Sequence, residues 1–377
     1  MKCHICKSKI FEINRFKKYH LVSSDCKPTF YSGDLSICSI CKTIQKPINS
    51  KWKIRVNKIY SKYEMFSQSL GDDQKLFNEK NIDQINRSSQ IISLIKKNII
   101  LEDKGNLLDI GCGTGPFIKS FSNIYPHWNL YGYEQDKKFA KYYKKIHNFK
   151  KLFINNLEKI NIKFDLIVLI HTLEHIVDPI NFLVKIKKFL NTNGKLFIEV
   201  PDFNKSPFDI LVADHSSHFV KENINLVAYR AGYKKIFCKS DIIPKEISSI
   251  YELSSRKNID IKKMIPKFKI NDQKKKINQY FNFYDRFLLS INKHKKSICI
   301  FGTSIAATWL AQSIKLDYFF CDEDKTRINK KHMNKKIYHP NKIPKGVKII
   351  LPFRNDIAKK IIKRLRASKK DFIVIDK

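Results

Sequence analysis

Three alternating glycines follow a short apolar run near residue 107. Asp109, Gly111, Gly113 and Gly115 occupy every second position, after Leu107–Ile110 and before a segment with helical apolar spacing. Glycine allows a tight turn and lets the backbone come close to a ligand. Dinucleotide sites usually read G-x-G-x-x-G, so this spacing, with a carboxylate two positions earlier, points to a different cofactor. We expect these four residues to form a cofactor-binding turn.

A second carboxylate is placed where a nucleoside would need it. Glu134 ends the run Tyr131-Gly132-Tyr133-Glu134 and lies about 20 residues beyond the glycine turn, the separation that one strand–helix–strand unit requires. Its oxygens can accept hydrogen bonds from two ribose hydroxyls. The pair of signals therefore predicts a bound nucleoside at one edge of a sheet.

These segments resemble the class I S-adenosylmethionine-dependent methyltransferases. The glycine turn matches their first motif, and the stretch from His171 to Pro179, which contains Leu-Glu-His-x-x-Asp-Pro, is similar to a segment of many small-molecule methyltransferases. The resemblance covers about residues 81–240. It implies S-adenosylmethionine as cofactor, with Asn156 near the adenine and His171 in the cofactor site. A sheet that binds NAD, or one that has lost its ligand, is the alternative.

Two Cys-x-x-Cys pairs lie in the first 41 residues: Cys3 with Cys6, and Cys38 with Cys41. In a reducing compartment such pairs are metal ligands rather than a disulfide framework. Four thiolates form the tetrahedral site that structural zinc prefers. A thioredoxin-like redox motif would need a βαβ context that this segment lacks. The sequence thus predicts one Zn²⁺ ion.

Asp214 and His215 follow the fifth expected strand of the middle region. A histidine titrates near neutral pH and can act as a general base, with Asp214 or a backbone group fixing its tautomer. Such a base could remove a proton next to a carbonyl group, as carbon methylation requires, or deprotonate a hydroxyl. A histidine that only packs against the next helix is the alternative, and His218 is expected to be structural.

The elements that would position these residues alternate between strands and helices. The alternation predicts an α/β protein with a doubly wound, mostly parallel Rossmann-like sheet in the middle and a smaller Rossmann-like α/β domain at the end. We divide the chain into a zinc module (1–75), a methyltransferase domain (76–242), a helical linker (243–293) and a C-terminal domain (294–377). Expected helices include 139–146 and 180–190, the second ending near Asn193-Gly194, a C-cap signal.

The composition of the 377 residues is that of a globular protein, with 43% hydrophobic residues and a formal net charge of +38. Lysine is enriched along the whole length without a basic tail, which favours compositional bias over nucleic-acid binding, although an anionic substrate also fits. No apolar run is long enough to span a bilayer and no signal peptide is recognisable. We expect a cytoplasmic location.

The order of the three parts resembles the sugar C-methyltransferases, which act on nucleotide-linked deoxysugars. That resemblance extends over nearly the whole chain and implies a nucleotide-linked keto sugar as substrate, with Asp214, His215 and a tyrosine, approximately matched by Tyr63, as catalytic residues. The alternatives are O- or N-methylation of a sugar or another small polar metabolite and, from a different class, binding or modification of RNA. The sequence does not predict the oligomeric state.

Overall fold

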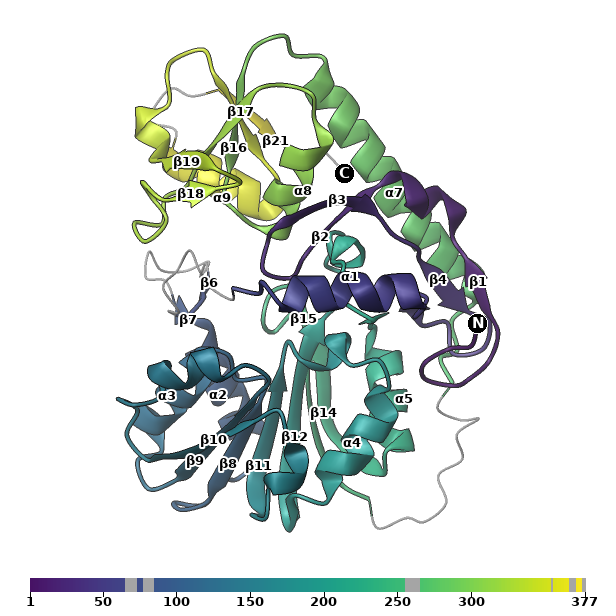
Figure 1. Ribbon diagram of the computed structural model, residues 1–377, viewed down its shortest axis with the longest axis vertical. Coiled ribbons are helices and arrows are strands. Elements are labelled where there is room, and N and C mark those ends of the chain that lie inside the picture. Colours follow the sequence, from purple (N-terminus) through teal and green to yellow (C-terminus); the bar gives the residue numbers. More distant parts are fainter. Residues whose placement is uncertain (65–72, 77–84, 255–264, 354, 366–370, 375–377) are drawn as a thin grey trace.

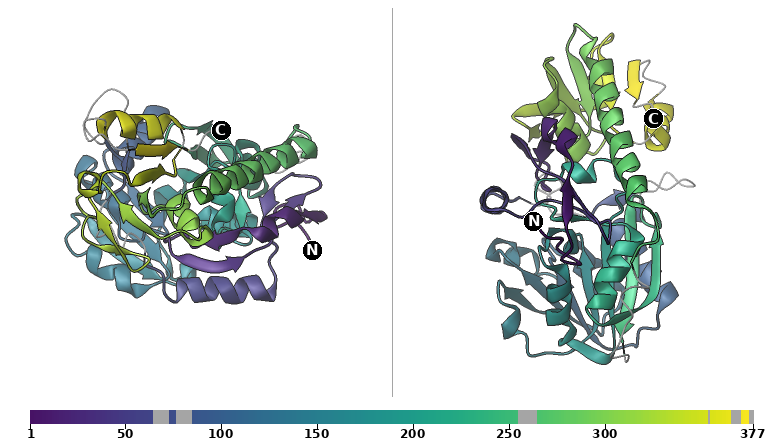
Figure 2. Two further views of the ribbon diagram at one scale, coloured as in Figure 1. Left: turned by 90° about the horizontal axis from the view of Figure 1, so that it is seen from above. Right: turned by 90° about the vertical axis from the view of Figure 1, so that its right-hand side faces the viewer.

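The computed structural model describes residues 1–64, 73–76, 85–254, 265–353, 355–365 and 371–374. Two sheet-containing lobes lie at opposite ends of an elongated molecule, and N-terminal segments lie between and beside them (Figure 1). Helix α7 (Ile270–Asn292) extends along one side from the middle of the molecule to the C-terminal lobe (Figure 2). Among the residues described, no helix is both long and apolar enough to cross a membrane.

The larger lobe holds a seven-stranded sheet in the order β10-β9-β8-β11-β12-β15-β14. Its first five strands are parallel, and β15 and β14 are antiparallel to their neighbours. The strands are β8 (Asn106–Ile110), β9 (Asn129–Glu134), β10 (Phe149–Ile154), β11 (Phe164–Ile170), β12 (Leu190–Pro201), β14 (Tyr233–Ser240) and β15 (Glu246–Leu253).

Helices cover both faces of this sheet. Leu107 packs with α2 (Arg87–Asn98) and α3 (Pro116–Ile124) in one core, and Leu108 packs with α4 (Pro179–Lys187) and α5 (Lys221–Arg230) in the other. Successive side chains of a strand point to opposite faces, so this single strand joins the two apolar layers. The predicted α/β class and the doubly wound Rossmann-like sheet are confirmed.

Three elements differ from the prediction. Helix α4 ends at Lys187, and Asn193-Gly194 lies inside β12, where a Cβ on Gly194 would sit 2.8 Å from the Phe164 carbonyl oxygen. That glycine marks the close approach of a neighbouring strand rather than a helix end, so the C-cap prediction was wrong. Instead of a helix over 139–146 there is a 3₁₀ helix, η2 (Lys137–Tyr142). Strand β15 joins the sheet from within the segment assigned to the linker.

The N-terminal segment does not fold around a sheet of its own. Strands β1 (Ile10–Glu12), β4 (Ser36–Cys38) and β5 (Ile44–Gln45) are completed by β13 (Ser217–His218), which comes from the large lobe. The hairpin β2 (His20–Val22) and β3 (Pro28–Ser32) packs on helix α8 of the C-terminal lobe, and α1 (Ser50–Tyr60) lies between the lobes (Figure 1). The two short strands β6 (Lys75–Leu76) and β7 (Ile85–Asn86) precede α2.

The C-terminal lobe is a second α/β unit, with the strand order β18-β19-β17-β16-β20-β21. Trp309 of its helix α8 is fully buried with Tyr284 of α7 and Phe16 of the N-terminal segment. This shared apolar core ties the first and last parts of the chain together. The elements are β16 (Ile298–Phe301), α8 (Ile305–Ser313), β17 (Tyr318–Cys321), β18 (Lys331–His332), β19 (Lys335–Tyr338), β20 (Lys348–Leu351), α9 (Asn355–Leu365) and β21 (Asp371–Val374).

Candidate active site and metal centre

The glycine turn connects β8 to α3 at the carboxyl edge of the large sheet. Gly111, Gly113 and Gly115 all have positive φ, at 78°, 53° and 79°, a conformation that other residues rarely adopt. A Cβ on Gly111 would lie 2.3 Å from the Thr172 hydroxyl oxygen, and one on Gly115 would lie 2.6 Å from the ring of Tyr143. At these two positions glycine is required by internal packing as well as by the turn.

Two carboxylates flank this turn. Asp109 is only 3% exposed and lines the large cleft, and Glu134 accepts a hydrogen bond of 2.9 Å from the Gly113 backbone N–H. Burial, together with the nearby charge of Glu134, raises the pKa of Asp109 to about 8, and burial raises the pKa of Glu134. A ligand that donates hydrogen bonds or carries a cationic amino group would relieve this electrostatic cost. The residues present therefore fit the ribose and amino groups of S-adenosylmethionine.

The other two predicted cofactor residues lie differently. Asn156 begins the 3₁₀ helix η3 (Leu157–Lys159), where its side chain accepts from the Glu158 N–H; like Gly113, Gly115 and Glu134, it is not among the residues that line the cleft. His171 does line the cleft and has a φ of 50°. Burial and Arg87 lower its pKa, but the carboxylates of Glu246 and Glu174 outweigh them and raise it to about 10.

His215 is held by Asp209, six residues earlier. The His215 Nδ1 lies 2.7 Å from Asp209 Oδ1, and the Nδ1 of His218 lies 2.7 Å from the other oxygen of the same carboxylate. A carboxylate accepts hydrogen bonds, so it favours the tautomer in which Nδ1 carries the proton and Nε2 is free to act as a base. The expectation that Asp214 fixes His215 was wrong, because the 3₁₀ turn η5 (Asp209–Leu211) brings Asp209 beneath the ring instead.

Asp214 serves a second histidine. Its Oδ2 lies 3.3 Å from the His175 Nδ1, and it accepts hydrogen bonds from the backbone N–H and the hydroxyl of Ser24, at 2.8 and 2.5 Å. Burial lowers the pKa of His175, but the hydrogen bond and charge of Asp214 and the charge of Glu174 outweigh it and raise that pKa. The His175 and His215 rings meet edge to face, with centroids 4.6 Å apart.

Tyr63 lies near this histidine pair. Its hydroxyl is 3.2 Å from the Ser24 Oγ, and its ring packs against Tyr60, whose hydroxyl lies 3.1 Å from the His175 Nδ1. Burial and the charge of Asp214 raise the pKa of Tyr63, so the phenol stays protonated at neutral pH. Tyr63 and Asp214 thus share the Ser24 hydroxyl as a hydrogen-bond partner, and Asp214 and His215 both contact His175; the catalytic roles of the three residues stay predictions.

One wide cleft is lined by Asp109, Gly111, Tyr63, His171, His175 and His215. It extends from Asp109 and Gly111 in the large lobe, past His175 and His215, to the first turn of α8 around Gly302 in the C-terminal lobe. Its lining contains 11 lysines and arginines, three histidines and 12 acidic residues, so positive and negative groups are nearly balanced. The large positive charge of the chain is therefore not concentrated in this cleft.

Sequence reasoning missed Asp209 and His175 as members of the site. Asp209 lies in an apolar stretch that carries no recognisable motif, and only the fold places it under His215 and His218. His175 belongs to the segment already singled out for its Leu-Glu-His-x-x-Asp-Pro pattern. Its position directly after strand β11, at the same sheet edge as the glycine turn, was the signal that could have identified it.

The four N-terminal cysteines converge at one point. Their sulfur atoms all lie within 4.8 Å of one another, with 3.5 Å between Cys3 and Cys41 and 3.3 Å between Cys6 and Cys38. Four ligands at about 2.3 Å around a tetrahedral zinc ion would be separated by roughly 3.8 Å. The four thiols therefore fit a zinc ion.

The two cysteine knuckles also have the same backbone geometry. The residue after each pair, Lys7 or Lys42, has a positive φ, and the N–H two residues after Cys3 and Cys38 points at its sulfur from 3.4 Å in both cases. Such N–H groups stabilise a thiolate. Each knuckle is thus preorganised to present two thiolates to one ion.

The site and the sheet together define the class of this region: a class I S-adenosylmethionine-dependent methyltransferase domain. Residues 83–236 match the family model described as a methyltransferase domain. Over 146 residues the chain is 31% identical to a tRNA U34 carboxymethyltransferase of Campylobacter concisus, an alignment that covers 34% of this chain. The chain spans about half the length of that relative, 50%.

Solved structures with similar folds include two further methyltransferases. An S-adenosylmethionine-dependent methyltransferase from Clostridium acetobutylicum matches with a TM-score of 0.38 and 13% identity, over 54% of this chain and 98% of its own. A complex of the Haloferax volcanii Trm112 methyltransferase activator with a putative methyltransferase matches with a TM-score of 0.40 and 8% identity, over 46% and 92% of the two chains.

Proposed function

We propose that this protein is an S-adenosylmethionine-dependent methyltransferase that methylates a carbon atom of a nucleotide-linked keto sugar. The observation that carries the proposal is the pair of Asp–His couples, Asp209–His215 and Asp214–His175, at the cleft that the glycine turn also lines. Methylation of an amine needs little proton transfer before the methyl group moves. Methylation of a carbon requires a base strong and close enough to remove a C–H proton.

The two histidines are suited to different tasks. His215, with Nδ1–H donated to Asp209, presents Nε2 as the base that takes the proton from the carbon next to the carbonyl group. The pKa of His175 is raised by Asp214 and Glu174. In its protonated form His175 would stabilise the negative charge that develops on the carbonyl oxygen. S-adenosylmethionine supplies an electrophilic methyl group. The new C–C bond forms as the C–S bond breaks, and the proton stays on His215 until it passes to solvent.

The cleft favours a long, polar acceptor. It is lined by residues of the N-terminal segment, of the large lobe and of the C-terminal lobe, such as Ser24, His215 and Gly302. A nucleotide-linked sugar could place its sugar ring at the histidines and its nucleotide toward α8. We propose further that the four cysteines hold a structural Zn²⁺ ion. The cofactor would be held by Asp109, Gly111, Gly113, Gly115, Glu134, Asn156 and His171.

A second candidate is methylation of RNA, because the relative from Campylobacter is named for a tRNA substrate. The balanced charges of the cleft argue against this acceptor, since binding of nucleic acid depends mainly on cationic contacts to phosphates. O- or N-methylation of a sugar or another polar metabolite would use the same cofactor site and is distinguished by the product.

The deciding experiment incubates the protein with labelled S-adenosylmethionine and nucleotide-linked sugars that have or lack a 4-keto group, with bulk tRNA as a further acceptor. We expect a methyl gain, detected by mass, only in a keto sugar. The keto sugar should also exchange its acidic proton with deuterated solvent when no methyl donor is present. His215→Asn should lower turnover about 100-fold and abolish the exchange while cofactor affinity stays constant. Methylation of tRNA alone would overturn the proposal.

A further inference from the structure

A buried lysine connects the cysteine module to the loop that carries the catalytic histidine. Lys46 directly follows β5 and is 1% exposed, among the largest fully buried side chains of the described residues. Its backbone N–H donates to the Ser216 carbonyl at 3.0 Å, and its Nζ donates to the carbonyl of Ile210. Lys46 therefore holds both ends of the segment that runs from Asp209 to His215.

The surroundings of the ammonium group are mixed. It lies 4.4 Å from the centroid of the Phe16 ring, and the carboxylates that act on it are Asp209, Asp34 and Asp214. Burial outweighs these carboxylates and lowers the pKa of Lys46 to about 7. Of the histidines near Asp209, His218 also feels the lysine charge. Burying a charged lysine side chain costs free energy, because the ammonium group loses its contact with water.

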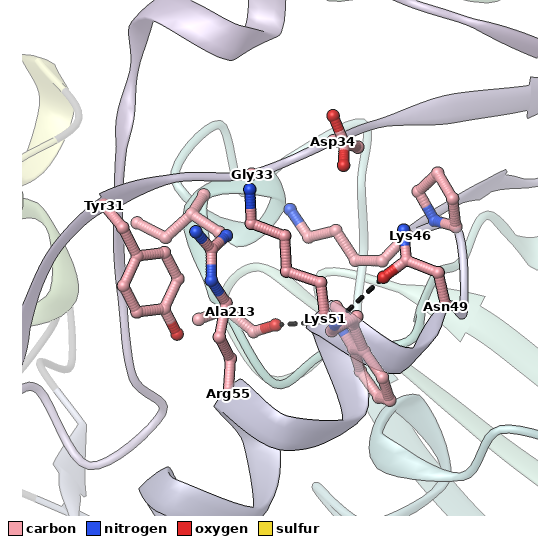
Figure 3. A pocket seen from close by; sticks show the side chains of 11 residues that line it. Tyr31, Gly33, Asp34, Lys46, Asn49, Lys51, Arg55 and Ala213 are labelled. Atoms are coloured by element: carbon pink, nitrogen blue, oxygen red, sulfur yellow. Dashed lines mark hydrogen bonds between the residues drawn. The ribbon is translucent and has the colours of Figure 1, made fainter.

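Lys46 lines a small pocket on the side of the loop away from the cleft. Figure 3 shows Lys46, Lys51 and Arg55 around this pocket, with Asp34 at its edge and Ala213 of the catalytic loop behind it. Trp52 of α1 also binds this loop: its indole N–H donates a hydrogen bond to the Ala213 carbonyl at 3.1 Å. Three carbonyls of the loop, at Ile210, Ala213 and Ser216, are thus held by residues 46–52.

We infer that Lys46 is a positioning residue for the general base: it holds the Asp209–Ser216 loop and the Asp209 carboxylate so that His215 keeps its proton on Nδ1 and Nε2 free. The inference rests on the proposed role of His215. An aliphatic side chain would fill the same volume and spare the desolvation cost, so stability alone does not account for a lysine here. The requirement is for a hydrogen-bond donor beneath the loop.

Two measurements on Lys46→Met test this inference. The first needs no acceptor: ¹⁵N NMR of histidine-labelled holoprotein with S-adenosylhomocysteine, in which the His215 signal is assigned by its loss in His215→Asn. The parent ring should be a single Nδ1–H tautomer, and the variant should show a second tautomer. The second is kinetic: turnover should fall about tenfold or more, with KM and cofactor affinity within about threefold of the parent.

Lys51→Met is the matched control, because Lys51 lies at the same pocket but is exposed and makes no hydrogen bond to the loop among those described. It should leave both readouts unchanged. Lys46→Gln, whose side chain is shorter, replaces Lys46→Met if that variant does not fold. The inference would be overturned if the variant kept a single His215 tautomer and the turnover of the parent. It would also be overturned if turnover fell only to the extent that the variant protein was unfolded at the assay temperature. If the parent methylates no acceptor, the proposed function fails, and the NMR signal still decides the role of Lys46.

Discussion

At the scale of single residues, the site contains two histidines that have different carboxylate partners. Asp209 shares its two oxygens between His215 and His218, whereas Asp214 bonds His175 and Ser24. Acid and base can coexist at one pH when neighbouring groups push their pKa values apart. The roles proposed for His175 and His215 follow from this division.

The pH dependence of turnover tests whether His175 acts in its protonated form. The pKa of His175 is raised, so a requirement for its cationic form makes turnover fall as the pH rises through that pKa. Asp214→Asn removes the largest favourable interaction, and the alkaline limb of the turnover profile should move to lower pH. Asp209→Asn is the control, since it should lower turnover without moving that limb. An unmoved limb in Asp214→Asn would show that cationic His175 is not needed.

Glu134 provides a test of the cofactor site. Glu134→Ala should weaken the binding of S-adenosylmethionine and of S-adenosylhomocysteine by about 1 to 3 kcal/mol, the cost of losing hydrogen bonds to a charged acceptor. Isothermal titration calorimetry measures both affinities, and Glu252→Ala, which removes a carboxylate paired with Lys195 elsewhere on the sheet, should leave them unchanged. Equal binding in Glu134→Ala and the parent would remove Glu134 from the site, and tight NAD binding would contradict the cofactor assignment.

At the scale of elements, one short strand determines how the cysteine module meets the catalytic loop. β13 pairs with β5, His218 lies opposite Ile44, and the Asn223 side chain donates to the Cys41 carbonyl at 2.7 Å. A disturbance of the knuckles therefore reaches the residues next to His215 through backbone hydrogen bonds. The four-cysteine cluster and the loop that carries His215 are therefore joined through the same small sheet.

The metal prediction follows from this coupling. The protein should contain about one zinc ion per chain by elemental analysis, and Cys38→Ser with Cys41→Ser should remove it. Thermal unfolding should then begin at a lower temperature, and turnover should fall with it. Cys238→Ser, outside the cluster, serves as the control. Unaltered zinc content in the double variant would show that other residues bind the ion.

The sequence predicted elements that have a clear apolar pattern or turn residues of their own. It missed elements that form only by pairing with residues far away in the sequence. The strand Phe164–Ile170 and the glycine turn carry their own apolar runs and turn residues, so both were predictable. β13 has only two residues and is a strand solely because β5 lies beside it. The partner of His215 escaped prediction for the same reason: Asp214 is adjacent in sequence, but the backbone turn places Asp209 within reach.

At the scale of the whole molecule, the net charge of +38 is distributed outside the proposed active site. The positive charge favours weak association with any polyanion, whereas in the proposed function the acceptor would be selected by shape and hydrogen bonds in the cleft. Non-specific binding and the choice of acceptor are therefore separate properties of this chain.

The salt dependence of RNA binding should reveal this separation. Binding of bulk tRNA through six to ten phosphate contacts should weaken by about 10³ to 10⁵ between 50 and 200 mM salt. Methyl transfer to the sugar acceptor should change little over that range, and tRNA should not inhibit it at 200 mM salt. Fluorescence anisotropy and the methylation assay measure the two properties. Strong inhibition by tRNA at the higher salt would place RNA in the cleft.

The strand that closes the N-terminal sheet also has a consequence for biosynthesis. Residues 1–45 leave the ribosome before Ser217 and His218, so their sheet lacks its last strand until those two residues have been made. Long-range pairing of this kind forms slowly, and domains otherwise fold in the order of their synthesis. During this interval the four cysteines stand in a sheet without its edge partner. Metal delivery to the nascent chain, rather than folding of the completed protein, could then limit the yield of active molecules.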